Sequence, residues 1–199
     1  HEPLIERALR FELDERMLAE GEVHVPLDED QVVSLAARLK TIGIDGVAVL
    51  LLHSYRNPEH EIRVKAILER ELPGVFISVS HELSQEYREF ERCSTVVANA
   101  YIGPKVRDYI AGIDDRIRDG GFEGSFLVVQ STGGLYESEQ AKSECVRMLE
   151  SGPAAGVIGT KALCDALGED NAISFDMGGT TAKSGVIYQG KQLTTGSAL

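Results

Sequence analysis

Residues 174–188 read Ser-Phe-Asp-Met-Gly-Gly-Thr-Thr-Ala-Lys-Ser-Gly-Val-Ile-Tyr. Apolar residues precede Asp176, two glycines and two threonines follow closely, and the chain becomes apolar again at Val186. This order predicts a strand, a glycine-rich turn and a second strand. Because Gly178 and Gly179 carry no side chain, a bulky anion such as a phosphate can approach their backbone N–H groups closely.

Other potential ligands flank this turn. Thr180 and Thr181 add hydroxyl donors, and the Asp176 carboxylate can hold a hydrated Mg²⁺ ion. The pattern differs from a P-loop, since the Walker sequence that ends in Gly-Lys-Ser/Thr is absent. Two interpretations stay open for the turn: a nucleotide-phosphate site, or a tight hairpin whose glycines adopt positive φ angles.

Composition restricts the partners of the chain. Its 199 residues carry a formal net charge of −12, which disfavours nucleic acid or an anionic membrane as the main partner. No apolar run approaches the roughly 20 residues of a membrane span. Cys93, Cys145 and Cys164 lie far apart, which predicts small core thiols in a reducing, cytoplasmic compartment. Since the chain starts at His1 without a methionine, we expect it to come from a longer protein.

Apolar periodicity along the chain predicts an α/β fold. A β-hairpin is expected first, with Phe11 and Leu13 in one strand and Val23 and Val25 in the other. The later expected strands cover 47–52, 75–79 and 126–129, and helices are expected from Asp28, Pro58, Tyr87, Pro104 and Pro153. The apolar stripes of the helices from Pro58, Pro104 and Pro153 include Ile62, Ala66 and Leu68; Val106, Tyr109, Ile110, Ile113 and Ile117; and Ala155, Ile158, Ala162 and Ala166. The strand–helix–strand unit 47–79 should be parallel.

Polar runs follow three of the expected strands: His53-Ser54-Tyr55, Ser80-His81-Glu82 and 130–134. If these strands are parallel neighbours, the runs share one sheet edge, where ligands bind in open α/β sheets. The runs read either as a substrate cleft or as ordinary beginnings of polar loops. A metal site at His53, His60 and Glu61 also stays open, as does a serine nucleophile at Ser131. The charged run 86–92 reads as a solvated helix face, with the alternative that Glu91 and Arg92 reach the cleft.

Taken in order, the chain resembles the hydantoinase A/5-oxoprolinase family, which includes the related subunit of acetone and acetophenone carboxylases. The resemblance covers nearly the whole chain. It rests on these motifs: Gly21-Glu22-Val23, Pro26-Leu27-Asp28, Leu51-Leu52-His53-Ser54-Tyr55, Asn57-Pro58, His60-Glu61, Ser80-His81-Glu82, Glu91-Arg92, Ser94-Thr95, Asn99-Ala100-Tyr101, Gln130-Ser131, Gly133-Gly134, Ser151-Gly152-Pro153-Ala154-Ala155-Gly156 and Phe175-Asp176-Met177-Gly178-Gly179-Thr180.

The resemblance implies an actin/sugar-kinase/Hsp70-like (ribonuclease H-like) ATPase fold of two lobes. Residues 1–150 would then form most of lobe one without its first phosphate hairpin. Residues 151–168 would form the hinge helix, and residues 169–199 the start of lobe two with the second phosphate hairpin. The adenosine-binding segment is expected beyond Leu199, so the chain by itself is expected to show no ATPase activity.

The activity that the resemblance implies is ATP-dependent opening of a cyclic amide, such as a hydantoin or 5-oxoproline, through phosphorylation of the carbonyl oxygen. The residues implied for this reaction are Asp176 for Mg²⁺ and catalysis; Gly178, Gly179, Thr180, Thr181 and Lys183 for ATP; and His53, His81, Glu82 and Arg92 for the substrate. Lys183 departs from the family, since most relatives carry Asp a few residues after Gly-Gly-Thr.

Partners and alternatives follow from the same resemblance. The expected partner is a hydantoinase B-type subunit or a fused equivalent region, and formation of a homo-oligomer stays open. Two other functions are considered. One is an ATP-dependent ketone carboxylase subunit, in which ATP activates an enol or bicarbonate. The other is a nucleotide-gated binding module, which would bind ATP and change its affinity for a partner without turning over a small molecule.

Overall fold

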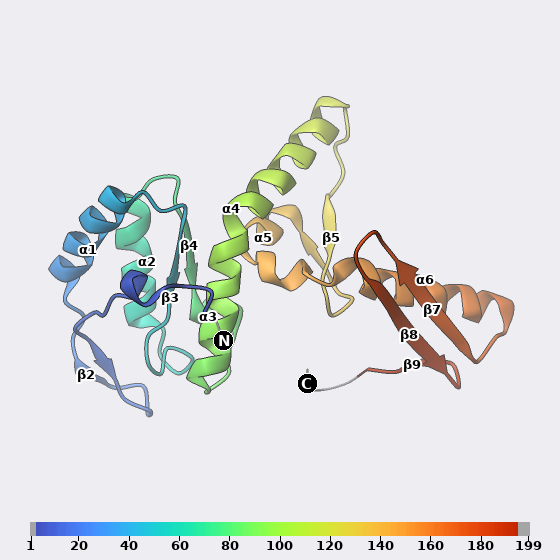
Figure 1. Cartoon of the computed structure of the whole chain (residues 1–199), viewed down its shortest axis with the longest axis horizontal. Coiled ribbons are helices and arrows are strands. Elements are labelled where there is room, and N and C mark those ends of the chain that lie inside the picture. Colours follow the sequence, from blue (N-terminus) through green and yellow to red (C-terminus); the bar gives the residue numbers. More distant parts are fainter. Residues whose placement is uncertain (1–2, 195–199) are drawn as a thin grey trace. The chain divides into compact units, whose positions relative to one another are not determined.

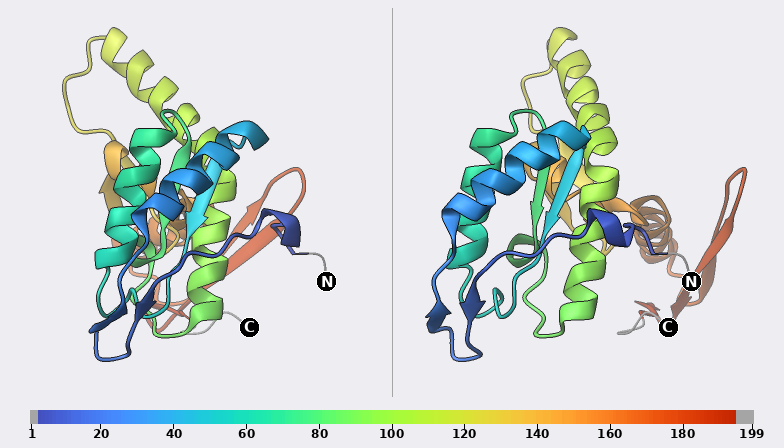
Figure 2. Two further views of the ribbon diagram at one scale, coloured as in Figure 1. Left: turned by 90° about the vertical axis from the view of Figure 1, so that its left-hand side faces the viewer. Right: turned by 60° about the vertical axis from the view of Figure 1, so that its left-hand side comes forward.

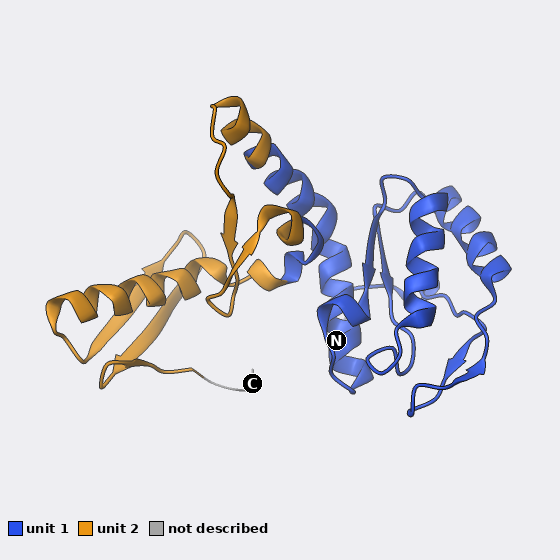
Figure 3. Cartoon of the chain, turned by 180° about the vertical axis from the view of Figure 1, so that it is seen from behind, with its two compact units in different colours: residues 1–113, 142–146 blue, residues 114–141, 147–199 orange. Residues whose placement is uncertain are grey.

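The computed structural model describes residues 3–194 and divides into two units, which Figure 3 distinguishes by colour. Unit 1 comprises residues 1–113 and 142–146, and unit 2 comprises residues 114–141 and 147–199. The long helix α4 contributes residues to both units. Among the described residues, no helix is both long and apolar enough to cross a membrane.

Unit 1 contains a two-stranded parallel sheet with helices packed against it (Figures 1 and 2). Strand β3 pairs with β4 in parallel, with Gly46 opposite Phe76, and α2 connects the two strands. This confirms the expected parallel strand–helix–strand unit. The elements are η1 (Arg7–Leu9), β1 (Arg16–Met17), β2 (Val23–Val25), α1 (Glu29–Ile42), β3 (Gly46–Val49), α2 (Glu59–Glu71), β4 (Phe76–Val79), α3 (Ser80–Leu83) and α4 (Glu89–Asp119).

Local signals set the ends of α1 and α2. The Asp28 carboxylate accepts a hydrogen bond from the backbone N–H of Gln31 at 3.1 Å and so caps the start of α1. Gly43 ends α1 in the left-handed conformation, with φ of 76°. At the start of α2, the Asn57 side chain accepts a hydrogen bond from the N–H of Glu59 at 3.1 Å. These are the ends that the sequence predicts.

Strand β4 is covered on both faces, and its side chains alternate between two environments. Ile77 and Val79 pack into the core formed with α1 and α2. On the other face, Ser78 accepts a hydrogen bond from the Asn99 amide of α4 at 2.9 Å. The alternation follows from the two-residue period of a strand. A strand buried on both faces therefore combines apolar residues with one polar residue that is satisfied by a partner.

Helix α4 corrects the expectation of two helices separated near Pro104, because the helix runs through this residue without a break. Proline has no N–H, so the carbonyl of Ala100 lacks its usual helical donor. That carbonyl lies against Gly46 of β3, where an added Cβ would come within 2.6 Å of the oxygen. Close packing against the sheet on this side holds the helix together. Ile110 is buried as expected, whereas Tyr109 is 68% exposed.

Unit 2 carries the predicted strand–turn–strand hairpin in a three-stranded antiparallel sheet of order β7-β8-β9. Helix α6 lies on one face of this sheet, where Val157 packs close to Gly185. Ser174 and Ile187 are buried. The elements are β5 (Leu127–Val129), β6 (Leu135–Glu137), α6 (Ser151–Leu167), β7 (Ala172–Met177), β8 (Ala182–Tyr188) and β9 (Lys191–Gln192). Helix α5 (Ser138–Ser143) spans the unit boundary, as does η2 (Cys145–Met148).

Two apolar stripes differ from expectation. In α2, Ile62 is 51% exposed and Ala66 is also exposed, whereas Val64, Ile67 and Leu68 face the core. The buried face of α2 also holds His60 and Glu61, which form polar contacts that the apolar period does not reveal. In α6, Ile158, Ala162 and Ala166 are exposed and Cys164 is buried instead. The helix rests on the sheet through the face that carries Val157 and Cys164.

Other expectations need smaller corrections. The first hairpin strand is the short β1, and Phe11 and Leu13 precede it and pack against the core instead. Helix α6 starts at Ser151 with Glu150 in the capping position, rather than at Pro153. Cys93 is exposed, contrary to the expectation of a core thiol, because it lies on the outer side of α4.

Two glycines of α4 provide a matched test of this packing. An added Cβ at Gly103 would lie 2.3 Å from a ring carbon of the buried Phe76, whereas one at Gly112 meets nothing within 4 Å. We expect Gly103→Ala to lower the free energy of unfolding by about 1–3 kcal/mol through overpacking. Gly112→Ala should raise it by roughly 0.5–1 kcal/mol, because alanine favours the helix. Urea denaturation of both variants measures the difference, and equal effects would contradict the packing described.

Candidate functional site

The turn between β7 and β8 needs its glycines neither for backbone conformation nor for packing within the chain. Neither Gly178 nor Gly179 adopts a positive φ angle. A Cβ added at either position would meet no atom within 4 Å. This contradicts the interpretation as a tight hairpin with glycines at positive φ. The two glycines instead leave free space over the backbone of the turn.

Backbone donors of the same turn are available. The N–H of Gly178 donates to the carbonyl of Thr181 at 3.0 Å and closes the turn. Among the described residues, no acceptor contacts the N–H groups of Gly179 and Thr180. Asp176, Thr180 and the glycines are exposed. The turn therefore presents unpaired donors and hydroxyl groups to solvent, as a site for an anion requires.

Asp176 and Lys183 lie opposite each other in the β7–β8 register, so their side chains share one face of the hairpin. Ser174 and Gly185 form the next pair on this face, which is the face that α6 covers. The Lys183 ammonium forms an ion pair with the carboxylate of Glu150, directly before α6. A lysine, an aspartate and the start of a 17-residue helix therefore accompany the turn.

The polar run 130–134 lies in unit 2, in a sheet separate from that of β3 and β4. It forms the turn of the antiparallel hairpin β5–β6, so the expected parallel arrangement of three strand ends is wrong. The N–H of Glu150 donates to the Ser131 hydroxyl at 3.0 Å, and the Glu150 carboxylate contacts Lys183. Glu150 thus links this run to the hairpin. Sequence reasoning missed it, although it directly precedes the Ser151-Gly152-Pro153 motif.

The other two polar runs do meet in unit 1, at the carboxyl ends of β3 and β4. The Ser54 and Ser80 hydroxyls lie 3.1 Å apart. His53 adopts φ of 59°, an uncommon value for a residue with a side chain, and its Nδ1 lies 3.4 Å from the Tyr55 hydroxyl. The Glu82 carboxylate forms an ion pair with Lys65 at 2.7 Å. Of the substrate residues implied by the resemblance, this edge holds His53, His81 and Glu82.

Glu61 of α2 organises this edge, whereas the sequence offered it only as a candidate metal ligand. Its fully buried carboxylate accepts four hydrogen bonds. They come from the N–H of Leu51 (2.8 Å), the Ser80 hydroxyl (2.7 Å), the N–H of His81 (2.9 Å) and Nδ1 of His81 (2.8 Å). Burial by itself raises the pKa of the Glu61 carboxyl, but the hydrogen bonds from His81, Ser80 and the backbone together hold it below its ordinary value.

Arg92 corrects the view of 86–92 as a solvated face, because its side chain is fully buried. Its Nη2 donates to the carbonyl of Leu51 at 2.7 Å, and its guanidinium lies 5.4 Å from the centre of the Tyr55 ring. Among the described residues, Nε and Nη1 have no hydrogen-bond partner. A buried cation with two unpaired donors is costly and is characteristic of a functional position.

The metal interpretation of His53, His60 and Glu61 is wrong. His60 pairs instead with the Glu15 carboxylate at 2.7 Å, and both side chains are nearly fully buried. No group of three or more His, Cys, Asp or Glu side chains within the described range could hold a metal ion. Glu61 uses both carboxylate oxygens for the hydrogen bonds described above.

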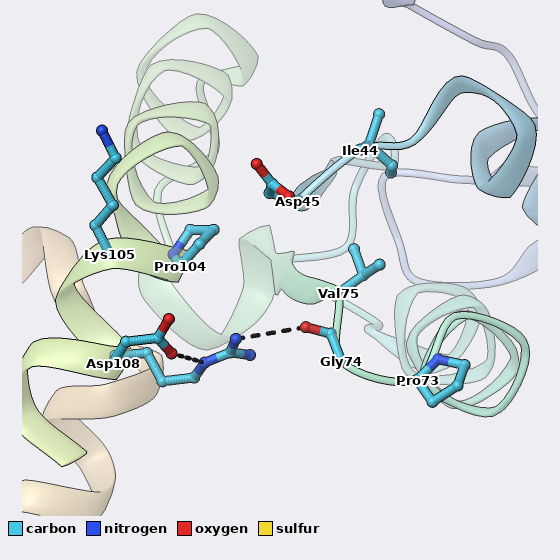
Figure 4. A pocket seen from close by; sticks show the side chains of 9 residues that line it. Ile44, Asp45, Pro73, Gly74, Val75, Pro104, Lys105 and Asp108 are labelled. Carbon is cyan, nitrogen blue, oxygen red and sulfur yellow. Dashed lines mark hydrogen bonds and ion pairs between the residues drawn. The ribbon is translucent and has the colours of Figure 1, made fainter. Parts of the chain in front are cut away.

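A pocket of about 440 Å³ lies at the opposite, amino ends of β3 and β4 (Figure 4). Arg107 spans it, donating to the Gly74 carbonyl at 3.4 Å and contacting the Asp108 carboxylate at 3.3 Å. Lys105 and Asp45 also line this pocket. The pocket holds none of the residues that the sequence predicts for the site.

The chain belongs to the hydantoinase/oxoprolinase family. The family model described as "Hydantoinase/oxoprolinase" matches residues 92–198, and the model of the "Hydantoinase/oxoprolinase N-terminal region" matches residues 1–72. The two matches include β3 but not β4, and they include the whole β7–β8 hairpin. The family expected from the motifs is therefore confirmed.

Solved structures of this family share the mixed α/β architecture. A nucleotide-free structure of acetone carboxylase, studied for ATP-dependent acetone carboxylation, matches 96% of the chain with a TM-score of 0.85 and 32% identity. The ATP-dependent caprolactamase of Pseudomonas jessenii matches 94% with a TM-score of 0.80 and 32% identity. In sequence, a 5-oxoprolinase of Saccharomyces cerevisiae is 34% identical over 77% of the chain. The chain spans 27% of each solved chain and 12% of the 5-oxoprolinase.

The lowered pKa of Glu61 predicts a pH-dependent contribution to stability. A carboxyl whose pKa is lower in the folded state stabilises the fold fully above its unfolded pKa of about 4.5. This contribution is lost as pH falls through the folded pKa. In Glu61→Gln, the amide has one acceptor oxygen where the carboxylate has two, so some of the four donors lose their partner. We expect the free energy of unfolding to fall by about 1–3 kcal/mol near pH 7.

Urea denaturation between about pH 7 and pH 3 measures this effect. The stability gap between the unmodified chain and Glu61→Gln should narrow as the solution becomes acidic. Glu82→Gln is the control, because the exposed pair with Lys65 contributes little and should give a small gap throughout. If the difference in free energy of unfolding between the unmodified chain and Glu61→Gln stays constant over this pH range, the Glu61 carboxyl is not the ionised group described here.

Proposed function

We propose that this chain is part of an enzyme that uses ATP to open a cyclic amide, such as a hydantoin, a lactam or 5-oxoproline. Membership of the hydantoinase/oxoprolinase family supports an ATP-dependent reaction. The caprolactamase and the 5-oxoprolinase, by their names, act on cyclic amides. An amide carbonyl is a weak electrophile, and phosphorylation of its oxygen converts it into one that water can attack.

The observation that carries the proposal is the β7–β8 turn. Its two glycines leave the backbone open without any conformational or packing need inside the chain, and the N–H groups of Gly179 and Thr180 point to no acceptor among the described residues. A nucleotide phosphate supplies the missing acceptors. Gly178, Thr181 and Lys183 complete the proposed ATP site, in which the lysine acts as a point charge.

The Asp176 side chain fits a hydrated Mg²⁺ ion, because its exposed carboxylate supplies the oxygen donors that this ion prefers. When bound, Mg²⁺ neutralises charge on the transferring phosphate. Asp176 would hold the ion through water, and the turn would fix the phosphate. In unit 1, His53, His81, Glu82 and Arg92 are proposed to orient the amide.

The same proposal includes the finer assignment of the fold to the actin/sugar-kinase/Hsp70-like ATPases. The proposed lobes are 1–150 and 169–199, with α6 within the hinge segment 151–168. The antiparallel β7–β8 hairpin that opens the proposed second lobe and the helix before it are compatible with this assignment. A hydantoinase B-type subunit or an equivalent fused region is the proposed partner, and the sparse cysteines support a reducing cytoplasm as the compartment.

Asp176→Asn in the full-length protein tests the phosphate site. The change keeps the shape of the side chain and removes its charge, so we expect ATP turnover to fall by roughly 100-fold or more. Asp165→Asn is the matched control, because Asp165 forms an exposed ion pair with Lys161 on α6. Steady-state phosphate release measures both variants. Normal turnover by Asp176→Asn would remove Asp176 from the proposed site.

The choice of substrate separates two reactions. The similarity to acetone carboxylase, with a TM-score of 0.85, favours ketone carboxylation as the second candidate. We expect ATP hydrolysis by the full-length protein with its partner to be stimulated by a hydantoin, a lactam or 5-oxoproline. Stimulation by a ketone together with bicarbonate, and by none of the cyclic amides, would replace amide opening with carboxylation. Binding of ATP without any turnover would instead favour a nucleotide-gated binding module.

A further inference from the structure

Glu61 and His81 form a hydrogen-bonded pair at the carboxyl ends of β3 and β4. The Glu61 carboxylate lies 2.8 Å from Nδ1 of His81, and the same oxygen accepts the backbone N–H of His81 at 2.9 Å. An ionised carboxylate only accepts hydrogen bonds, so Nδ1 must carry the proton. The lowered pKa of Glu61 agrees with an ionised carboxylate at neutral pH.

This proton position decides what the other ring nitrogen can do. In a neutral imidazole with the proton on Nδ1, Nε2 keeps its lone pair and can accept a proton. Among the described residues, Nε2 of His81 has no partner. The side chain of His81 is 13% exposed, so the edge of the ring can be reached from solvent.

A second buried pair shows why exposure matters. His60 also binds a glutamate through Nδ1, with the Glu15 carboxylate at 2.7 Å. Its side chain is only 3% exposed, compared with 13% for His81. The two pairs share the same chemistry, but the His60 ring is enclosed. His60 therefore serves as an internal reference for a histidine–glutamate pair that cannot meet a ligand.

We propose that Glu61 is a positioning residue that presents Nε2 of His81 as the proton acceptor for a ligand at the carboxyl ends of β3 and β4. The identity of this ligand, a cyclic amide activated by ATP, rests on the proposed function. As a water oxygen bonds to the activated carbonyl carbon, one O–H bond of the water breaks and its proton moves to Nε2. When the ring carbon–nitrogen bond breaks, the same proton passes to the departing nitrogen, and the carbonyl carbon is left as an acyl phosphate. A second water then cleaves the acyl phosphate and releases the carboxylate and inorganic phosphate.

The surroundings of His81 supply charges of both signs. From α2, Glu61 contacts the ring, and Lys65 pairs with Glu82, the residue that follows His81. From α4, Arg92 donates to the carbonyl of Leu51, whose N–H is bound by Glu61. The charge in direct contact with the imidazole is therefore the Glu61 carboxylate, which favours the imidazolium formed during proton transfer.

Two-bond ¹H–¹⁵N correlation spectra of this chain test the proton position without any enzymatic activity. We expect the neutral ring of His81 to carry its proton on Nδ1, as the ring of His60 does. His81→Gln and His60→Gln assign the two signals. A neutral His81 that carries its proton on Nε2 would overturn the proposal, whatever the substrate of the enzyme.

Kinetics of the full-length protein test the role itself. We expect His81→Gln to lower kcat by about 100-fold while KM for ATP stays within about threefold. Glu61→Gln should lower kcat and leave KM for ATP unchanged, because the imidazole loses the carboxylate that holds its Nδ1–H. His60→Gln and Glu15→Gln should leave kcat unchanged. An unchanged kcat in His81→Gln, or in Glu61→Gln, would overturn the proposal.

These outcomes are distinct from failure of the proposed function. If Asp176→Asn abolishes ATP turnover while His81→Gln remains fully active, the phosphate site stands and the role of His81 is wrong. If ketone and bicarbonate stimulate ATP turnover in place of cyclic amides, the proposed substrate is wrong. In that case the proton on Nδ1 and the kcat of His81→Gln with the ketone still decide whether His81 accepts a proton.

Discussion

The buried carboxylate of Glu61 is the interaction on which unit 1 depends. It joins three consecutive parts of the strand–helix–strand unit, since it lies on α2 and binds the backbone after β3 and the residues that follow β4. A buried carboxylate is costly unless donors surround it. Here four donors surround it, so the carboxylate fixes the loops at the carboxyl ends of both strands instead of weakening the core.

The peptide groups of Leu51 transmit this constraint to α4. The N–H of Leu51 binds Glu61, and its carbonyl binds the guanidinium of Arg92. A negative and a positive side chain thus hold the same residue from two helices, and neither is neutralised by direct contact with the other. This arrangement leaves Nε and Nη1 of Arg92 without partners in the described part of the chain, next to the His53–Tyr55 turn. A buried cation with unpaired donors destabilises the fold, and this one lies at the edge that holds His53 and His81.

Local features were predictable from the sequence, and features that depend on distant partners were not. The cap at Asp28, the glycine at Gly43 and the β7–β8 hairpin follow from short-range signals. The continuity of α4 through Pro104 depends on packing against β3, which no local rule contains. The apolar run before Gln130 is compatible with a parallel or an antiparallel strand, so its placement in unit 2 required the structure. The sequence offered Glu61 only as a metal ligand beside His60, because its actual partners are separated from it by 10 to 20 positions.

The functional assignments of the two units rest on the same physical criterion. Native structures pair nearly all buried polar groups, and polar groups without internal partners remain available to a ligand. In unit 2 these groups are the N–H donors of Gly179 and Thr180, in a turn whose glycines have no internal purpose. In unit 1 they are the outer nitrogen of His81 and the inner nitrogens of Arg92. Donors in an open turn suit an anion, whereas an oriented imidazole beside a cation suits proton transfer to or from a polar ligand. The different functions proposed for the two units therefore follow from the polar groups that have no hydrogen-bond partner within each unit.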